Sequence, residues 1–323
     1  MSELDLAPIV LFVYNRPEHT KKTLQALSLN KLASKSKLFV YSDGSKDITD
    51  IENVTKINKV REIVRSNSWC GELKLIEAEY NIGLADSIKN GVTKIVEKFG
   101  KVIVIEDDII TSPAFLTYMN KALNFYINRK SVFFISGFNY PATKMKIPDD
   151  YTYDVYVSIR NSSWGWATWA DRWNQIDWDI KNYQSLVNSS AIQEAFSREG
   201  DDVLDLLYKR QSGELKIWSI QSTFAQFENH GITIFPTQSY VDNVGMDGSG
   251  ENCGTNEYFK NNVLCQKEEI HFLEILYQDK RIINSYYNVN CRKKRPLWKK
   301  IMRRIIKKLY NTDTFVIKKK IYS

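Results

Sequence analysis

The first 135 residues alternate short apolar runs with segments whose apolar residues recur every three or four positions. The runs predict β-strands, and the periodic segments predict amphipathic helices. An order in which strand and helix alternate favours an α/β fold, with a mostly parallel sheet flanked by helices on both faces. We expect strands over residues 8–14, 37–43, 73–78 and 102–106, and helices from Pro17, over 47–65 and over 83–99.

The pattern is less regular after residue 112. Residues 138–180 are rich in aromatic side chains and show no clear period. We find no internal repeat and no flexible linker, and therefore expect one domain over residues 1–291, with halves that meet at residue 135, followed by a tail over 292–323. After residue 112 we expect a helix over 113–129, a strand over 131–137, helical structure over 201–230 and a strand over 232–236.

Composition is that of a globular protein, with 43% hydrophobic residues. No apolar run reaches the length of about 18 residues that a membrane-spanning helix needs. The first apolar run follows Glu3 and Asp5 and lacks a basic leader, so it predicts a strand and not a signal peptide. The four cysteines form no CxxC pair and there are three histidines, a combination that predicts no zinc cluster and a reduced, cytosolic setting.

Charge is distributed unevenly along the chain. Residues 292–323 hold 13 Lys and Arg and one acid, so the net charge of +7 leaves residues 1–291 at −5. From Leu297 to Tyr310 the apolar residues fall on one helical face and the basic residues on the other. This pattern predicts a basic amphipathic helix at a membrane surface, through residues 292–310. A helix that docks on the domain is the alternative, and the continuous apolar stripe argues against a nucleic-acid partner.

Three acids, Glu106, Asp107 and Asp108, follow the strand predicted over residues 102–106. Carboxylates beside an apolar interior are unfavourable unless something neutralises them, and a hard cation such as Mn²⁺ or Mg²⁺ would do so. The alternative is a solvated loop. Polar residues also follow the first and second strands, at Arg16 and Asp43. Because ligands bind beyond the carboxyl ends of parallel strands, these positions together predict a binding site.

The segments YNRPEHTKKTLQAL, YSDGSKD, NIGLADSIKNGV and VIVIEDD, in this order, resemble a glycosyltransferase with the GT-A fold. The chain is most similar to the branch related to N-acetylglucosaminyltransferase I and to bacterial surface-polysaccharide transferases, over about residues 7–255. The resemblance implies transfer of a sugar from a nucleotide-sugar donor, a UDP-sugar, to a glycan acceptor. It further implies that Arg16 contacts the nucleotide or its phosphates, Asp43 the base or ribose, Asn81 and Gly83 the border of the donor, Asp108 the metal, and Glu106 and Asp107 the sugar and ribose.

The aromatic segment SSWGWATWADRW matches the acceptor-side loop of the related family. An indole offers a flat face to a sugar ring, so we assign Trp164, Gly165 and Trp166 to acceptor binding. Trp169 and Trp173, four residues apart, are instead expected to form the core stripe of a helix.

The sequence offers two candidates for the catalytic base. In many relatives an acid follows a tryptophan, whereas the matching stretch here, IWSIQ, has Ser219 after Trp218. Glu214 and Asp247 are the candidates that remain, and a simple turn aspartate is the alternative for Asp247. The glycine-bearing loop around Asp247 is suited to closing over donor and acceptor.

Two other functions compete with sugar transfer. A sugar-phosphate nucleotidyltransferase would normally carry a glycine-rich, basic loop after the first strand, which YNRPEHT lacks. A non-catalytic protein that binds nucleotide sugars or glycans is suggested by the missing acid after Trp218. For a transferase, the basic tail predicts a peripheral enzyme at the inner face of the cell membrane, acting on a glycan or lipid-linked glycan in surface-polysaccharide synthesis.

Overall fold

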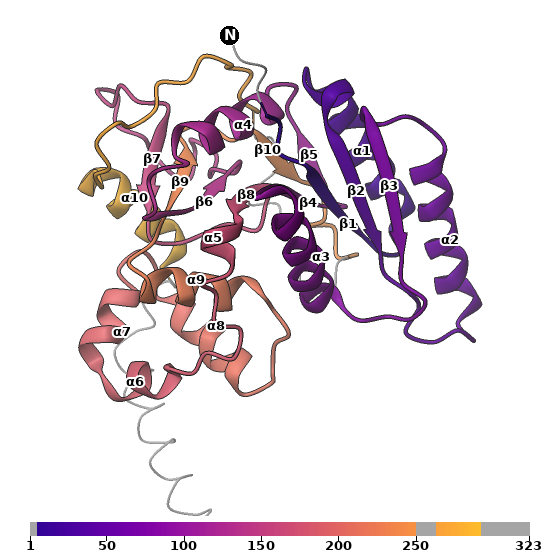
Figure 1. The fold of residues 1–323 in the computed structure, drawn as a ribbon. Helices are drawn as coiled ribbons and strands as arrows, with labels where there is room; N and C mark the ends of the chain where they lie inside the picture. Colours follow the sequence, from indigo (N-terminus) through magenta and orange to yellow (C-terminus); the bar gives the residue numbers. More distant parts are fainter. Residues whose placement is uncertain (1–4, 250–262, 292–323) are drawn as a thin grey trace, which may run out of the picture.

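The computed structural model describes residues 5–249 and 263–291. In these ranges it contains a mixed eight-stranded sheet with the order β3-β2-β1-β4-β8-β6-β9-β7, and a two-stranded sheet made of β10 and β5 (Figure 1). The larger sheet contains strands from before and after residue 135. The strands are β1 (Ile9–Val13), β2 (Lys37–Ser42), β3 (Glu72–Glu77), β4 (Lys101–Glu106), β5 (Ile109–Thr111), β6 (Val132–Ser136), β7 (Val155–Ser158), β8 (Trp166–Trp169), β9 (Ile232–Pro236) and β10 (Val241–Asn243).

The first four strands run parallel, as the alternating sequence pattern predicts. Helices cover both faces of this part of the sheet (Figure 1). Successive residues of a strand point to opposite faces, so Ile103 packs with α1 and α2 on one side while Val104 packs with α3 on the other. The helices are α1 (Pro17–Ser28), α2 (Ile51–Arg65) and α3 (Leu84–Phe99).

The second half of the sheet is mixed. Strand β8 runs antiparallel to both β4 and β6, β9 runs parallel to β6, and β7 is antiparallel to β9. In the β4–β8 register Trp166 lies opposite Val104 and Trp169 opposite Lys101. The start of β8 therefore lies at the same edge of the sheet as the carboxyl end of β4.

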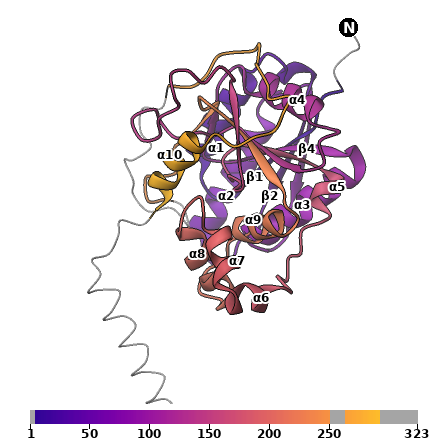
Figure 2. The same ribbon diagram turned by 90° about the vertical axis from the view of Figure 1, so that its left-hand side faces the viewer.

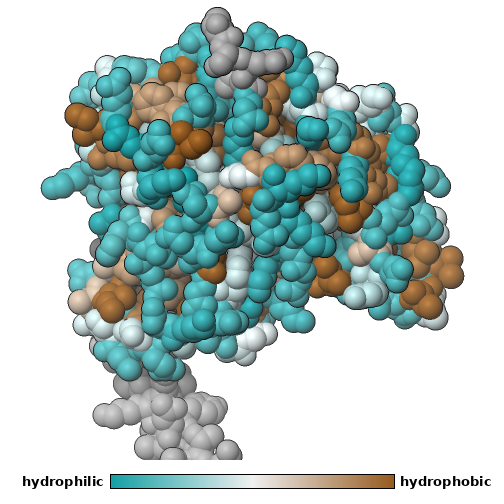
Figure 3. Space-filling view, viewed as in Figure 1, coloured by the Kyte–Doolittle hydropathy of each residue, from teal (hydrophilic) through white to brown (hydrophobic). Residues whose placement is uncertain are grey.

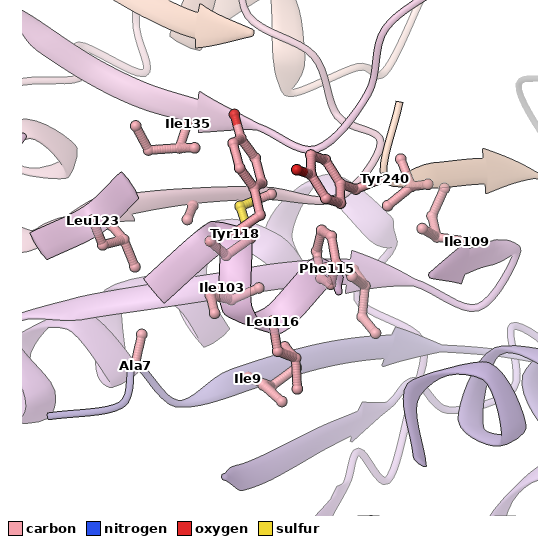
Figure 4. Close-up of a cluster of buried hydrophobic side chains, with 14 of the residues drawn as sticks. Ala7, Ile9, Ile103, Ile109, Phe115, Leu116, Tyr118, Leu123, Ile135 and Tyr240 are labelled. Atoms are coloured by element: carbon pink, nitrogen blue, oxygen red, sulfur yellow. The ribbon is translucent and has the colours of Figure 1, made fainter. Parts of the chain in front are cut away.

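Helix α4 (Phe115–Phe125) packs in one apolar cluster with residues of the small sheet and of the large sheet. In Figure 4 the Tyr118 ring lies beside that of Tyr240, Phe115 lies next to Tyr240, and Leu116 points toward Ile9. The rings of Tyr118 and Tyr240 stack with centroids 4.4 Å apart, and Asn120 accepts a hydrogen bond from Ala7 N over 2.8 Å. These contacts hold α4 against the residue that precedes β10 and against the residues that lead into β1.

Helices α6 to α9 lie together beside the second half of the sheet, and helix α10 lies apart from this group (Figure 2). Helices α6 to α9 share a separate apolar cluster that includes Leu186, Phe196 and Phe224. Helix α10 covers another cluster through Ile282 and Tyr286. The bounds are α5 (Ala170–Trp173), α6 (Tyr183–Asn188), α7 (Ser190–Phe196), α8 (Asp202–Gln211), α9 (Ser219–Glu228) and α10 (Lys280–Asn290), with a short 3₁₀ turn η1 (Ala33–Lys35).

The structure confirms every strand and helix predicted for the first 135 residues and the α/β class, with end points that differ by a few residues. The helical structure predicted over residues 201–230 is confirmed and consists of two helices, α8 and α9. One expectation needs correction. Trp169 is the last residue of β8 and Trp173 the last of α5; both are buried, but they pack in different clusters and form no helical stripe.

The predicted amphipathic helix in the tail lies outside the described residues, and the boundaries at residues 135 and 291 stay predictions. Within residues 5–249 and 263–291, no helix combines the length and apolar content that crossing a bilayer requires. On the face shown in Figure 3, hydrophilic side chains cover most of the surface, and apolar side chains emerge in separate groups.

Candidate active site

A cavity opens at the carboxyl ends of β1, β2 and β4, beside the start of α3. Its location agrees with the general rule for ligand sites in parallel sheets. Seven of the residues predicted for the donor and the metal line this one cavity: Arg16, Asp43, Asn81, Gly83, Glu106, Asp107 and Asp108.

One end of the cavity is aromatic. Phe12 of β1 and Tyr41 of β2 stack with ring centroids 5.5 Å apart, and Gly91 of α3 lies directly against both rings. Leu84 and Ser87 add the wall from α3. The Phe12 and Tyr41 rings form a flat apolar floor, and the lining residues Tyr41 and Ser87 carry hydroxyl groups. Such a surface suits a planar ring such as a nucleobase. The sequence reasoning did not identify this floor, although Tyr41 lies two residues before Asp43 on the predicted second strand.

The Asp43 side chain links the end of β2 to the segment that follows β3. Its carboxylate accepts hydrogen bonds from the backbone N–H groups of Gly44 (2.9 Å), Ile82 (3.0 Å) and Gly83 (2.9 Å). Gly83 has φ +82°, a conformation that glycine adopts with little strain, and it caps α3. Asn81 donates to Gly44 O over 3.0 Å. The Asp43 carboxylate therefore uses three of its acceptor positions to stabilise the cavity wall. About one of its four acceptor positions is left for a ligand.

Two of the three acids at the end of β4 bind the same arginine. Asp107 and Asp108 are buried and both accept from Arg16, with Nε to Asp107 Oδ2 at 3.2 Å and Nη2 to Asp108 Oδ2 at 3.0 Å. A second, shorter contact joins Nη2 to Asp107 Oδ1. Helix α1 secures the backbone here, because Thr23 Oγ1 donates to Asp107 O over 2.8 Å. Arg16 thus lies at the cavity as predicted, but its partners in this structure are the acids themselves.

The three acids would, if all were ionised, carry more negative charge than Arg16 balances. Burial, and then the charges of Asp108 and Asp107, raise the pKa of Glu106 to about 8. Burial also raises the pKa of Asp107, against the opposing effect of Arg16. A divalent cation would relieve this repulsion, and oxygen ligands are those that Mg²⁺ and Mn²⁺ prefer.

The donor set fits a cation held partly by its substrate. Among the described residues no three His, Cys, Asp or Glu side chains converge closely enough to form a complete metal site. Mg²⁺ commonly binds through one or two carboxylates and completes its shell with water and phosphate oxygens. Asp108, the predicted metal ligand, lines the cavity together with Glu106 and Asp107. Arg16 Nη1 is buried without a hydrogen-bond partner in the described part of the chain and is available to an anionic group.

The segment of residues 243–249 crosses directly over Asp108. Val244 N donates to Asp108 O over 2.9 Å, and the backbone of Gly245 packs against the Asp108 carboxylate. Farther along, Asp247 Oδ2 lies 3.1 Å from Nε2 of His19 on α1. Ser249 reaches the lining of the donor cavity. The segment therefore spans from the acids to the cavity and is fastened to α1 by His19, a residue the sequence reasoning did not single out.

A second cavity lies between the residues that precede β8 and helices α8 and α9. Trp164, for which acceptor binding stays a prediction, lines it beside Phe138 and Tyr140. The assignments of Trp166 and Gly165 are wrong. Trp166 is 1% exposed and packs against Trp173 and Trp218 in the core.

Gly165 is buried behind Trp164 and does not face the second cavity. Its φ is +60°, and its carbonyl oxygen accepts from Gly137 N over 2.7 Å. A Cβ at this position would meet Val241 Cγ1 at 2.9 Å. Gly165 therefore lets the chain turn just before β8 while its backbone bonds the residue that follows β6, and its role is structural.

The two candidate bases lie apart from each other. Glu214 is exposed in the connection between α8 and α9, 3.7 Å from Lys209, and lines neither of the two cavities described. The Asp247 side chain is half-exposed, and hydrogen bonds from the Ser249 hydroxyl (2.6 Å) and backbone N–H (3.0 Å) hold its pKa at about 2. A carboxylate with so low a pKa is a weak base in this conformation. Ser219, at the position of the expected acid, lines the second cavity.

Comparisons with known proteins give one family. The model of the GNT-I family matches residues 1–183, more than half of the chain. None of the curated proteins matches.

Among solved structures, "Crystal structure of S. aureus TarS 1-349" is 13% identical, with a TM-score of 0.39, and the match covers 73% of this chain and 59% of that one. "Crystal structure of S. aureus TarS" is 12% identical, with a TM-score of 0.36, and the match covers 73% of this chain and 36% of that one. This chain thus spans 59% and 36% of the two TarS chains. The family match, which includes both the Arg16 and Asp108 regions, shows that the chain belongs to the GNT-I family of GT-A glycosyltransferases.

Proposed function

We propose that the protein transfers a sugar from a UDP-sugar to a glycan acceptor, with Mn²⁺ or Mg²⁺ as cofactor. The observation that carries the proposal is the single cavity that joins the Phe12–Tyr41 floor to Arg16 and Asp108. A planar base fits the first end, and a diphosphate fits the second, where the Arg16 guanidinium lies beside the Asp108 carboxylate that would hold a cation. A nucleoside diphosphate is the ligand class that needs both ends.

Each residue has a stated part in this reaction. Asp108 holds the cation, and Arg16, released from the acids, binds the diphosphate. The cation, when bound, supplies electrostatic stabilisation to the charge that develops on the departing diphosphate. Arg16 adds a fixed positive charge at the same place, so the bond to the sugar breaks more easily. Glu106 and Asp107 border the space for the sugar and ribose, and Trp164 contacts the acceptor from the neighbouring cavity.

The test measures release of UDP from a panel of UDP-sugars with Mn²⁺, with and without EDTA. We expect slow UDP release by the wild type and a decrease of at least 100-fold in Asp108→Asn, the size of effect found when a preorganised transition-state contact is lost. Glu52→Gln, which changes an exposed carboxylate on α2, is the matched control. Saturable UDP-sugar binding without UDP release would favour a binding protein, and pyrophosphate release from UTP and a sugar phosphate would favour a nucleotidyltransferase.

The acceptor is proposed to be lipid-linked and the enzyme peripheral at the inner face of the membrane, in surface-polysaccharide synthesis. The support is the sequence of residues 292–310, in which basic and apolar residues alternate in pairs. We expect the full chain to sediment with vesicles that contain anionic lipid and to remain in solution with neutral vesicles. The double change Arg303→Glu and Arg304→Glu should abolish this binding, and binding that is unaffected by the change would refute the membrane role.

A further inference from the structure

The second cavity shares the sheet edge that carries the acids. Trp166 pairs with Val104 in the antiparallel β4–β8 register, so the residues before β8 continue toward the end of β4 at Glu106. Trp164 belongs to this approach and lines the cavity. Its ring meets that of Phe138 edge-on, with centroids 4.6 Å apart. The cavity is therefore next to the place where a donor sugar would be released, with an aromatic wall on one side.

The opposite side of the cavity presents an amide that is already oriented. Asn161 Nδ2 donates to Ser222 Oγ over 2.7 Å, and Asn161 Oδ1 accepts from Thr223 Oγ1 over 2.6 Å. Both partners belong to α9, so the helix fixes the plane of the amide. One N–H and one lone pair of Asn161 are left for a ligand. The hydroxyl groups of Ser162, Ser163 and Ser219 also lie along the lining.

The cavity carries no uncompensated charge. Arg160 is the one charged residue among its described lining residues, and its two terminal nitrogens bind the Asp202 carboxylate at 2.6 and 2.8 Å. The guanidinium also lies over the Tyr286 ring of α10, 6.0 Å from the centroid. An anionic group placed here would lose water without gaining a free cation. An aromatic wall, oriented amide groups and hydroxyls instead match a ring with hydroxyl groups and no charge.

We propose that this cavity binds the terminal sugar of the acceptor and that it selects a neutral sugar over a uronic acid. The inference rests on the proposed transfer reaction, which it extends by naming the acceptor class and the residues that bind it. Trp164 stacks on the ring, Asn161 bonds its hydroxyl groups, and the Arg160–Asp202 pair keeps the site electrically neutral. Asp202 acts through Arg160 and is a positioning residue.

The test uses the full chain and three probes: methyl β-D-glucoside, methyl N-acetyl-β-D-glucosaminide and methyl β-D-glucuronide, with affinities measured by saturation-transfer NMR titration. We expect at least one neutral glycoside to bind at least fivefold more tightly than the glucuronide. Trp164→Ala and Asn161→Ala should each weaken that binding at least tenfold. Phe125→Ala, which removes a half-exposed aromatic ring from α4, is the matched control and should leave it unchanged.

A variant that should change the selectivity provides a more specific test. Asp202→Asn removes the negative charge beside Arg160, so the preference for the neutral glycoside over the glucuronide should fall at least fivefold. The proposal is overturned if no glycoside binds the wild type at 50 mM, if binding survives both Trp164→Ala and Asn161→Ala, or if the glucuronide binds best. Calorimetry with UDP and Mn²⁺ separates the two proposals: glycoside binding at Trp164 without any UDP binding supports the cavity assignment and counts against the transferase.

Discussion

Gly245 lies so close to Asp108 that a methyl group on Gly245 would overlap the Asp108 carboxylate. The same carboxylate accepts a hydrogen bond from Arg16, so it has little freedom to move aside. The segment of residues 243–249 therefore packs tightly against Asp108, the proposed metal ligand. A substitution in this segment should change metal-dependent binding at Asp108.

Replacing Gly245 with alanine tests this fit. We expect Gly245→Ala to weaken the binding of UDP in the presence of Mn²⁺ at least tenfold, about 1.4 kcal/mol, because Asp108 must leave its position. Calorimetry measures the affinity, and Met246→Ala, in the same segment, is the control that leaves Gly245 in place. An unchanged affinity in Gly245→Ala would show that Asp108 does not depend on this contact.

Arg16 and the cation are expected to compete for the same acids. Removing one partner of a buried ion pair destabilises a protein by about 3–5 kcal/mol, so Arg16→Gln should lower the melting temperature. Added Mn²⁺ should restore more of this stability in Arg16→Gln than it adds to the wild type, because the acids then lack any other cation. UDP should bind more weakly to Arg16→Gln, since the diphosphate loses its guanidinium.

Thermal unfolding with and without Mn²⁺, together with UDP calorimetry, checks both effects. Arg281→Gln, which breaks an exposed pair with Asp150, is the control. If Mn²⁺ raised the melting temperatures of wild type and Arg16→Gln equally, the acids would not be its site.

The sequence predicted β1 and β4 well because both are buried on both faces of the sheet. In β1 and β4 almost every residue is buried, which produces continuous apolar runs. Strands β7 and β8 have four residues each and are buried throughout, so neither alternation nor length distinguishes them from an aromatic loop. Three-dimensional pairing, which the local sequence does not encode, decides their structure.

The site was predictable to the extent that strand ends determine it. Arg16, Asp43 and Asp108 meet because parallel strands bring their carboxyl ends together. Trp164 and Trp166 could not be separated in advance, because an indole suits both a sugar site and a core. Their places follow from β8, whose first residue is Trp166.

The two tryptophans should differ sharply in their effect on stability. Trp166→Ala is expected to lower the free energy of unfolding by about 3–5 kcal/mol, as for other fully buried aromatic residues. Trp164→Ala should have a smaller effect, because Trp164 is half-buried. Trp166→Phe should be milder than Trp166→Ala, since it retains a ring and removes a buried N–H that has no partner in the described residues. Urea unfolding of the three variants measures these differences, and equal losses for the two alanine variants would contradict this placement.

Ser249 is expected to control the ionisation of Asp247. The two hydrogen bonds from Ser249 hold the pKa of Asp247 at about 2, and Ser249→Ala removes one of them, so the pKa should rise toward the ordinary value of about 3.9. Because the pKa in the folded state is lowered, the stabilisation is fully present above about pH 4 and is lost as the pH falls through 2. Carboxyl NMR titration measures the shift.

Asp47 is the internal control for that titration. Hydrogen bonds from Thr49 lower its pKa, and they are unaffected by the change at Ser249. A pKa of Asp247 that stayed at about 2 in Ser249→Ala would show that another group holds it.

Strand β9 has a consequence for how the chain reaches its folded state. It lies between β6 and β7, yet it comes from residues 232–236, about fifty residues past the end of the family match at residue 183. Until the chain has passed through α6 to α9, β6 and β7 each present an unpaired edge, and such edges invite association between molecules. Pairing of segments so distant along the chain is slow. We therefore expect closure of the sheet by β9 to be the late step of folding, and the one most dependent on chaperones.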